Sequence, residues 1–120
     1  MAERTVALPD AEAQPGVLEV GNVWINFLNY QVAVDGQPVV LTFQEFELLS
    51  SLVQQPDRVV PVDAITESIW AESGRPVVRR LNVLIHRLRA KMARSRPYQI
   101  ESVRGRGYGF LAVGGRRRAG

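Results

Sequence analysis

The hydrophobic pattern of this chain changes its spacing twice, and this order limits the folds that the chain can adopt. Short runs rich in β-branched and aromatic residues extend from residue 18 to residue 40, and apolar residues then recur at helical spacing from residue 42 to residue 94. An alternating pattern with glycines at its centre follows, from residue 99 to residue 113. We therefore predict four strands, three helices and a terminal hairpin, which together make an α+β domain.

The N-terminal part is expected to form an antiparallel sheet. Gly21-Asn22, Asn29 and Asp35-Gly36 divide it into short runs, and an Asp-Gly pair between apolar runs is typical of a hairpin. The four expected strands cover residues 18–20, 23–28, 31–34 and 38–40.

Composition sets the boundaries of the domain. Residues 1–16 mix alanine, acidic residues and two prolines without a hydrophobic period, so we expect a flexible tail or linker there. Hydrophobic residues make up 46% of the chain, which is enough for one buried core. We assign residues 17–113 to a single domain and residues 114–120 to a basic disordered tail.

The three helices have recognisable ends. Thr42 and Glu45 have the spacing of a capping box at the start of the first helix, and Pro56 is expected to end it. Pro61 is expected in the first turn of the second helix. The second and third helices are expected over residues 62–70 and 77–94, with a connecting loop over residues 71–76.

The charged residues are sorted by position along the chain. Residues 1–78 contain three basic and eleven acidic residues, a net charge of −8, whereas residues 79–120 contain twelve basic residues and one acidic residue, a net charge of +11. The two parts give the overall charge of +3. Such a basic surface favours a nucleic-acid backbone as partner, although basic residues can also simply solvate a face.

Several classes of function are poorly supported by this sequence. Cysteine is absent, which removes disulfides and thiolate metal sites, and His86 is the only histidine. We therefore expect no catalytic residue, no metal site, no cofactor and no enzymatic activity. No run approaches the ~20 apolar residues that span a bilayer, and the first residues lack a signal peptide, so we expect a cytoplasmic protein without a membrane segment.

The third helix is expected to bury one apolar stripe and to show a basic face. Arginine can contact guanine, asparagine adenine and valine a thymine methyl group, while other basic side chains can contact phosphates. Without the charge asymmetry, an ordinary helix with a solvated basic face would fit equally well. The expected stripe is Leu81, Leu84, Ile85, Leu88 and Met92, the expected base-contacting face is Arg79, Asn82, Val83, His86 and Arg87, and the expected phosphate contacts are Arg80, Arg89 and Lys91.

The terminal hairpin has glycines and arginines at its tip. Gly105 and Gly107 permit a positive φ and a close approach of the backbone to another surface. Arg104 and Arg106 can then enter a minor groove, where A·T-rich stretches concentrate negative potential. This Gly-x-Gly motif precedes a strand, whereas the dinucleotide-binding loop requires a following helix, so we do not interpret it as a nucleotide site.

A set of motifs occurs in a fixed order over about residues 18–112. The motifs are Leu41-Thr42, Glu45-Phe46-x-Leu48-Leu49, Arg58-Val59-Val60, Ile69-Trp70, Val83-x-Ile85-x-Arg87-Leu88-Arg89 and Val103-Arg104-Gly105-x-Gly107-Tyr108-x-Phe110. This set resembles the OmpR/PhoB-type winged-helix DNA-binding domain, the effector domain of bacterial response regulators. The resemblance implies a winged helix-turn-helix with an N-terminal four-stranded antiparallel sheet, three helices and a C-terminal β-hairpin wing.

The resemblance also implies roles for individual residues. Arg79, Val83 and Arg87 match helix positions that meet DNA, and Arg89 matches one near the DNA backbone. In the hairpin, Arg104 matches the wing arginine of the minor groove, and Ser102 matches a position near a phosphate. The segment that contacts RNA polymerase in activators of the family corresponds to Glu72, Ser73, Gly74 and Arg75. Positions where the family often has other residues are Asn82, Leu84, His86 and Gly109, so the target sequence cannot be taken from a relative.

The predicted function is sequence-specific binding of double-stranded DNA by a bacterial transcriptional regulator. The third helix would lie in the major groove and the wing, residues 101–111, at the minor groove. The resemblance implies two copies head-to-tail on a direct repeat, and we expect the protein to associate with the nucleoid. Two alternatives stay open: a winged helix that mainly contacts RNA polymerase or another regulator, and a non-specific nucleic-acid binder. Response regulators carry a receiver domain ahead of this one, and residues 1–16 cannot supply it.

Overall fold

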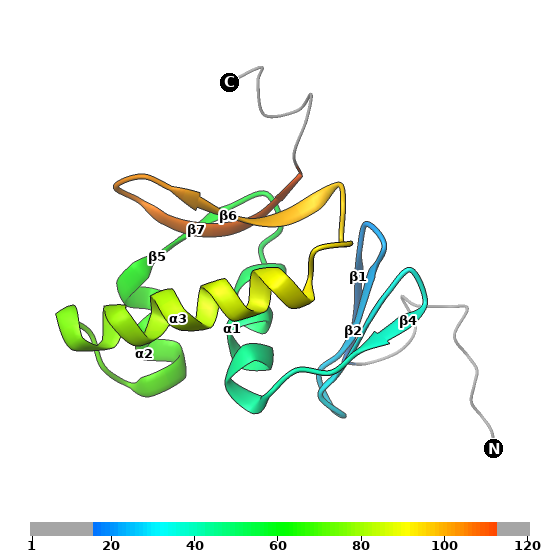
Figure 1. Ribbon diagram of the computed structural model, residues 1–120, viewed down its shortest axis with the longest axis horizontal. Coiled ribbons are helices and arrows are strands. Elements are labelled where there is room, and N and C mark those ends of the chain that lie inside the picture. The colour runs from blue at the N-terminus through cyan, green and yellow to red at the C-terminus, as the bar shows by residue number, and fades with distance from the viewer. Residues whose placement is uncertain (1–15, 113–120) are drawn as a thin grey trace.

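A computed structural model describes residues 16–112 of the chain (Figure 1). In this part of the chain, two separate sheets are joined through three helices. The N-terminal sheet has the order β1-β2-β3-β4, and the C-terminal sheet has the order β5-β7-β6. All strand pairs are antiparallel. The elements are β1 Val17–Val20, β2 Val23–Asn26, β3 Gln31–Val34, β4 Gln37–Val39, α1 Phe43–Val53, β5 Val59–Pro61, α2 Val62–Trp70, α3 Arg75–Lys91, β6 Tyr98–Val103 and β7 Gly107–Ala112.

The N-terminal sheet confirms the predicted four-stranded antiparallel order. Its inward positions alternate with outward ones, as a sheet with one buried face requires. Gly16, assigned above to the tail, already belongs to the folded part, because its carbonyl accepts a hydrogen bond of 2.7 Å from the Phe27 N–H. The rest of the expected tail and residues 113–120 lie outside the described residues. The inward side chains are Val23, Ile25, Val32 and Val34.

Helix α1 begins with the predicted capping box. The Glu45 N–H donates to Thr42 Oγ1 at 3.2 Å, and the Thr42 N–H donates to Glu45 Oε1 at 2.9 Å. These two bonds satisfy backbone donors that the first turn of a helix leaves without partners. The helix ends at Val53, before Pro56, and buries most of its apolar residues against the other helices.

Helices α2 and α3 differ from the prediction at their starts. Helix α2 has the predicted bounds, but Pro61 is its N-cap rather than a first-turn residue. Helix α3 begins at Arg75, two residues earlier than predicted, after Gly74 with a φ of 108°. Pro76 does not prevent this start, because a first-turn proline has no intrahelical hydrogen bond to lose. The helix ends at Lys91 rather than Arg94, and the connecting loop shortens to residues 71–74.

The C-terminal sheet contains a strand that the sequence pattern did not predict. Strand β5 pairs with β7, with Val59 opposite Gly109 and Val60 opposite Tyr108. It has only three residues and ends in a proline, so it lacks an alternating pattern of its own. The predicted hairpin is therefore two strands of a three-stranded wing sheet.

The core lies where the three helices meet the inner faces of both sheets. Its largest fully buried side chains include Leu49 from α1, Ile65 from α2, Leu81 and Leu88 from α3, and Phe110 from β7. Burying large apolar side chains from every layer packs α3 against the wing sheet, and Figure 1 shows the β6–β7 hairpin running alongside α3.

Candidate nucleic-acid interface

Helix α3 presents the two faces that its sequence predicts. All five residues of the expected apolar stripe are buried, at 5% exposure or less. The opposite side exposes Arg79, Asn82, His86 and Arg87 to solvent. Val83 lies among them with 51% of its surface exposed. A single exposed valine is ordinary on a protein surface, but arginine, asparagine and valine together are side chains that can contact base edges in a major groove.

Asn82 is linked to the wing. The Tyr108 hydroxyl donates a hydrogen bond of 3.1 Å to Asn82 Oδ1. Asn82 was expected to contact bases, whereas Tyr108 was not among the expected DNA contacts. The register of the hairpin could have indicated this role, because Tyr108 lies opposite Ser102, which was a candidate site residue.

Arg89 is also linked to the wing. Its Nε donates to the Ile100 carbonyl at 3.0 Å, and its Nη2 donates to Ser102 Oγ at 2.9 Å. Arg89 and Ser102 were both expected to lie near DNA phosphates. The structure brings them together, so each has a partner within the protein before any ligand is present.

Arg80 lies at the other end of the helix, beside the loop that precedes α3. Its guanidinium is 5.9 Å from the centroid of the Trp70 ring, and its Nη1 is 3.8 Å from Glu72 Oε1. Both charged side chains are more than half exposed, so this ion pair contributes little to stability. Trp70 is half-buried, packs against the core and supports Arg80 with its ring.

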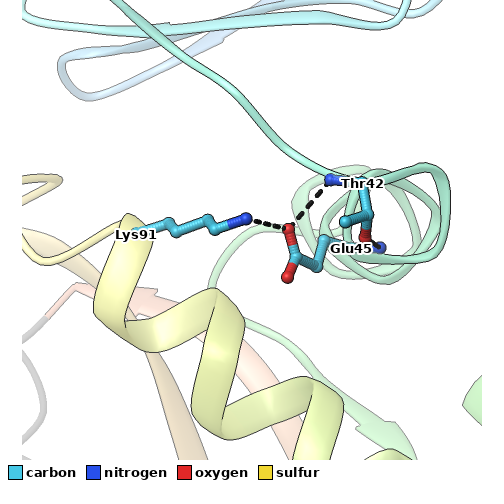
Figure 2. A network of polar contacts seen from close by, with 3 residues as sticks. All are labelled: Thr42, Glu45 and Lys91. Carbon is cyan, nitrogen blue, oxygen red and sulfur yellow. Dashed lines mark hydrogen bonds and ion pairs between the residues drawn. The ribbon is translucent and has the colours of Figure 1, made fainter.

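Lys91 has a different partner from the phosphate that was expected. Figure 2 shows its ammonium extending from the end of α3 to the start of α1, where Nζ donates to Glu45 Oε1 at 2.7 Å. Glu45 is 2% exposed and Lys91 39% exposed. Burial acts to raise the pKa of Glu45, but hydrogen bonds from Lys91 and Thr42 and the positive charge of Lys91 outweigh it and lower the pKa below its ordinary value of 4.5.

The wing tip is exposed and basic. Gly105 has a φ of 74°, the left-handed backbone that the turn requires, and the Arg106 N–H closes the turn on the Val103 carbonyl at 2.9 Å. Within residues 16–112, six of the side chains expected to contact DNA have no hydrogen bond or ion pair and so are free to bind a ligand. They are Arg79, Val83, His86 and Arg87 on α3, and Arg104 and Arg106 on the wing.

The expected polymerase-contact loop is exposed but shorter than predicted. Glu72, Ser73 and Gly74 lie on the loop surface, whereas Arg75 is the first residue of α3.

Among the described residues, no group of three or more His, Cys, Asp or Glu side chains could hold a metal ion. No helix in this part of the chain is long and apolar enough to cross a membrane.

Comparison with known proteins identifies the family. Residues 36–110 match the family model described as the C-terminal part of transcriptional regulatory proteins. The chain belongs to this family. The match begins in the Asp-Gly turn before β4 and ends within β7, so it includes the helices α1, α2 and α3, the strand β6 and most of β7.

Curated relatives in the family are bacterial regulators. The chain is 34% identical to the sensory transduction protein RegX3 of Mycolicibacterium smegmatis over 82% of its own length and 44% of that protein. It is 37% identical to the transcriptional regulatory protein PmrA of Pectobacterium parmentieri over 76% of its own length and 40% of that protein. The chain thus spans less than half the length of these relatives.

Solved structures of family domains share the fold. The DNA-binding domain of RstA from Klebsiella pneumoniae, solved in complex with the RstA box, matches with a TM-score of 0.71 and 29% identity over 79% of this chain and 96% of that one. The DNA-binding domain of CpxR from E. coli matches with a TM-score of 0.72 and 29% identity over 82% and 98% of the two chains. The predicted α+β winged-helix class is confirmed, as is the resemblance to OmpR/PhoB-type domains.

Proposed function

We propose that this chain binds double-stranded DNA in a sequence-specific manner as the DNA-binding part of a bacterial transcriptional regulator. The observation that carries this function is the exposed face of α3, where Arg79, Val83 and Arg87 have no hydrogen bond or ion pair within residues 16–112. The basic wing is attached to the same helix through Asn82 and Arg89. The solved RstA domain, a member of the same fold class, was crystallised with its DNA box.

The two basic elements match the two grooves of DNA. A major groove admits one α-helix, and α3 is anchored through its buried stripe so that its opposite face can enter. The wing tip projects beyond the sheet with Arg104 and Arg106 exposed, which suits the narrower minor groove. In this assignment Arg79, Val83, His86 and Arg87 contact bases, and Arg80 contacts a phosphate.

Further parts of the proposal concern assembly. Two copies would lie head-to-tail on a direct repeat, and residues Glu72, Ser73 and Gly74 would face RNA polymerase from the loop before α3. Binding to the chromosome would place the protein in the nucleoid of the cytoplasm. A Glu72→Ala variant that binds its operator normally but loses activated transcription in a purified system would support the polymerase contact, and unchanged activation would contradict it.

Selection from a random double-stranded DNA library at near-physiological salt tests the main proposal. Enrichment of one short motif in tandem is expected, and the spacing of its copies gives the half-site distance. Retained DNA without an enriched motif would instead support a non-specific nucleic-acid binder. The absence of retained DNA would contradict DNA binding altogether.

Binding to another protein is a second candidate function, favoured by exposed apolar side chains on the N-terminal side of the domain. Tyr30, Val40 and Phe43 are 57%, 83% and 62% exposed. The Tyr30 and Phe43 rings lie 5.6 Å apart and form one aromatic surface. An apolar interface depends little on salt, so binding to a purified regulator that persists at high salt would support this function.

A further inference from the structure

We infer that Asn82, Arg89, Ser102 and Tyr108 form a clamp that fixes the wing at one position relative to α3, so that both elements contact DNA at a set spacing. These four are positioning residues rather than base contacts. The inference deepens the proposed DNA binding and depends on it for the consequence at the operator, but the clamp itself can be tested without DNA.

The clamp joins one cross-strand pair of the hairpin, Ser102 and Tyr108, to one side of helix α3. Ser102 and Tyr108 lie directly opposite each other in the β6–β7 register, so their side chains point to the same face of the hairpin. Asn82 and Arg89 are seven residues apart, which places them on the same side of α3, two turns or about 10 Å apart along its axis. Tyr108 bonds to the first and Ser102 to the second.

Two attachment points restrict the wing more than one would. A single hydrogen bond between a hairpin and a helix leaves the hairpin free to pivot about that bond. Here Arg89 holds both the Ile100 carbonyl and the Ser102 hydroxyl, and Asn82 holds the Tyr108 hydroxyl. The Ser102–Tyr108 pair lies next to the Val103–Gly107 pair, from which the exposed tip extends. The position of the tip therefore depends on the clamp.

The bond from Tyr108 requires an acceptor oxygen at position 82. Aspartate and asparagine have the same shape, and either side chain can accept the hydrogen bond from Tyr108, but only asparagine can also donate to adenine. The acceptor oxygen is therefore the property that the clamp needs from this position.

Four variants distinguish a clamp residue from a base contact. Tyr108→Phe removes the hydroxyl and leaves Asn82 in place, whereas Asn82→Leu removes the acceptor. Asn82→Asp keeps the acceptor and removes the amide donor. Tyr30→Phe, a remote change of the same kind in the turn between β2 and β3, is the matched control.

The first measurement needs no DNA. Because the chain has no cysteine, Ser68→Cys on α2 and Arg106→Cys at the wing tip allow two nitroxide labels to be attached selectively. We expect pulsed electron–electron double resonance to give a narrow distribution of the distance between the two labels in the wild-type background, in Asn82→Asp and in Tyr30→Phe. A broader distribution is expected in Tyr108→Phe and Asn82→Leu, and an unchanged width in both of these variants would overturn the clamp.

The second measurement uses the operator that library selection provides. In the operator, the A·T-rich stretch that the wing is proposed to contact is moved by one base pair relative to the stretch that α3 contacts. The resulting loss of affinity is then measured. Tyr108→Phe should reduce this loss by about two- to ten-fold relative to wild type, the range expected for one hydrogen bond, whereas Asn82→Asp should not reduce it. An equal loss in wild type and Tyr108→Phe would overturn the role of the clamp in spacing.

Failure of the clamp and failure of DNA binding remain distinguishable. If selection enriches no motif, the proposed function fails while the label distances still decide whether the clamp exists. If a motif is enriched and Asn82→Asp changes the preferred base at one position, Asn82 is a base contact and its assignment as a positioning residue is overturned.

Discussion

The basic residues of α3 differ in whether their side chains already contact other parts of the protein. Arg89 is bound to the wing, Lys91 to α1, and Arg80 lies on Trp70 near Glu72. Arg79 and Arg87 have no partner within residues 16–112. A side chain held by the protein must give up or share its bonds to contact a base, so the unheld arginines are the stronger candidates for sequence recognition.

Arg87→Ala should weaken specific binding by roughly 1–3 kcal/mol and relax the preference at one base pair, because a bidentate contact to guanine is lost. Competition titrations with the selected operator and its single-base variants would measure both effects. The control is a random duplex of the same length. An equal loss on operator and random duplex would show that Arg87 contacts only a phosphate.

Lys91→Met should lower the free energy of unfolding by about 1–3 kcal/mol at pH 7, because a buried carboxylate loses a charged donor while the methylene packing is kept. Its effect should depend on pH. The pKa of Glu45 is lowered on folding, so its ionised form stabilises the fold above pH 4.5, and this contribution is lost as pH falls through the lowered value. Chemical denaturation at several pH values should show the variant approaching wild type in acid.

The same variant tests the change of role assigned to Lys91. If its ammonium serves Glu45 rather than DNA, the slope of affinity against salt concentration should be the same in Lys91→Met and wild type. A slope of affinity against salt that is smaller by about one unit in Lys91→Met would show instead that Lys91 contacts a phosphate, as expected from the sequence.

At the scale of elements, the features predicted correctly are those with local signals. The capping box of Thr42 and Glu45 lies within four residues, and the bounds of α2 follow from one short apolar pattern. Strand β5 was missed because its partner, Gly109, lies fifty residues beyond Val59 in the sequence. The start of α3 was misplaced because Pro76 ends many helices, although in the first turn it is well tolerated.

Gly109→Ala should separate β5 from β7, because an added Cβ would lie 2.6 Å from the Arg58 carbonyl oxygen. We expect a loss of roughly 1–3 kcal/mol, typical of overpacking, and faster amide hydrogen exchange in β5. Gly105→Ala is the control: its Cβ meets nothing within 4 Å, and its cost of about 1 kcal/mol comes from the left-handed backbone. Exchange in β5 that is equally fast in both variants would contradict this account.

Arg104→Ala should weaken binding most on operators with an A·T-rich flank, where the narrow minor groove attracts an arginine most strongly. Binding titrations on two operators that differ only in the flank give the comparison. Loss of affinity that does not depend on flank composition would contradict the minor-groove assignment.

The whole molecule separates its charges, with basic residues on α3 and the wing and acidic residues mostly before them in the sequence. If six to ten phosphates are contacted, affinity for the operator should fall by about 10³–10⁵ between 50 and 200 mM salt. Titrations across that range provide the measurement. A nearly constant affinity would contradict a DNA backbone as the main partner.

The network of the site could not be predicted, because folding creates it from distant positions. Lys91 and Glu45 are 46 residues apart, Tyr108 and Asn82 26, and Arg89 and Ser102 13. A helical wheel shows which side chains leave the core but not which neighbouring element they meet. The exposed basic face was therefore predictable, whereas its division into held and free side chains was not.

The links between α3 and the wing also bear on how new DNA specificities arise among related regulators. Both ends of every link lie within residues 75–112, a continuous stretch that begins just after the α2–α3 loop. Transplanting α3 alone from a relative would bring new base-contacting side chains but could break the match to the resident wing. Recombination at the loop would instead transfer helix and wing together, so we expect the inherited unit of specificity to be this whole cassette.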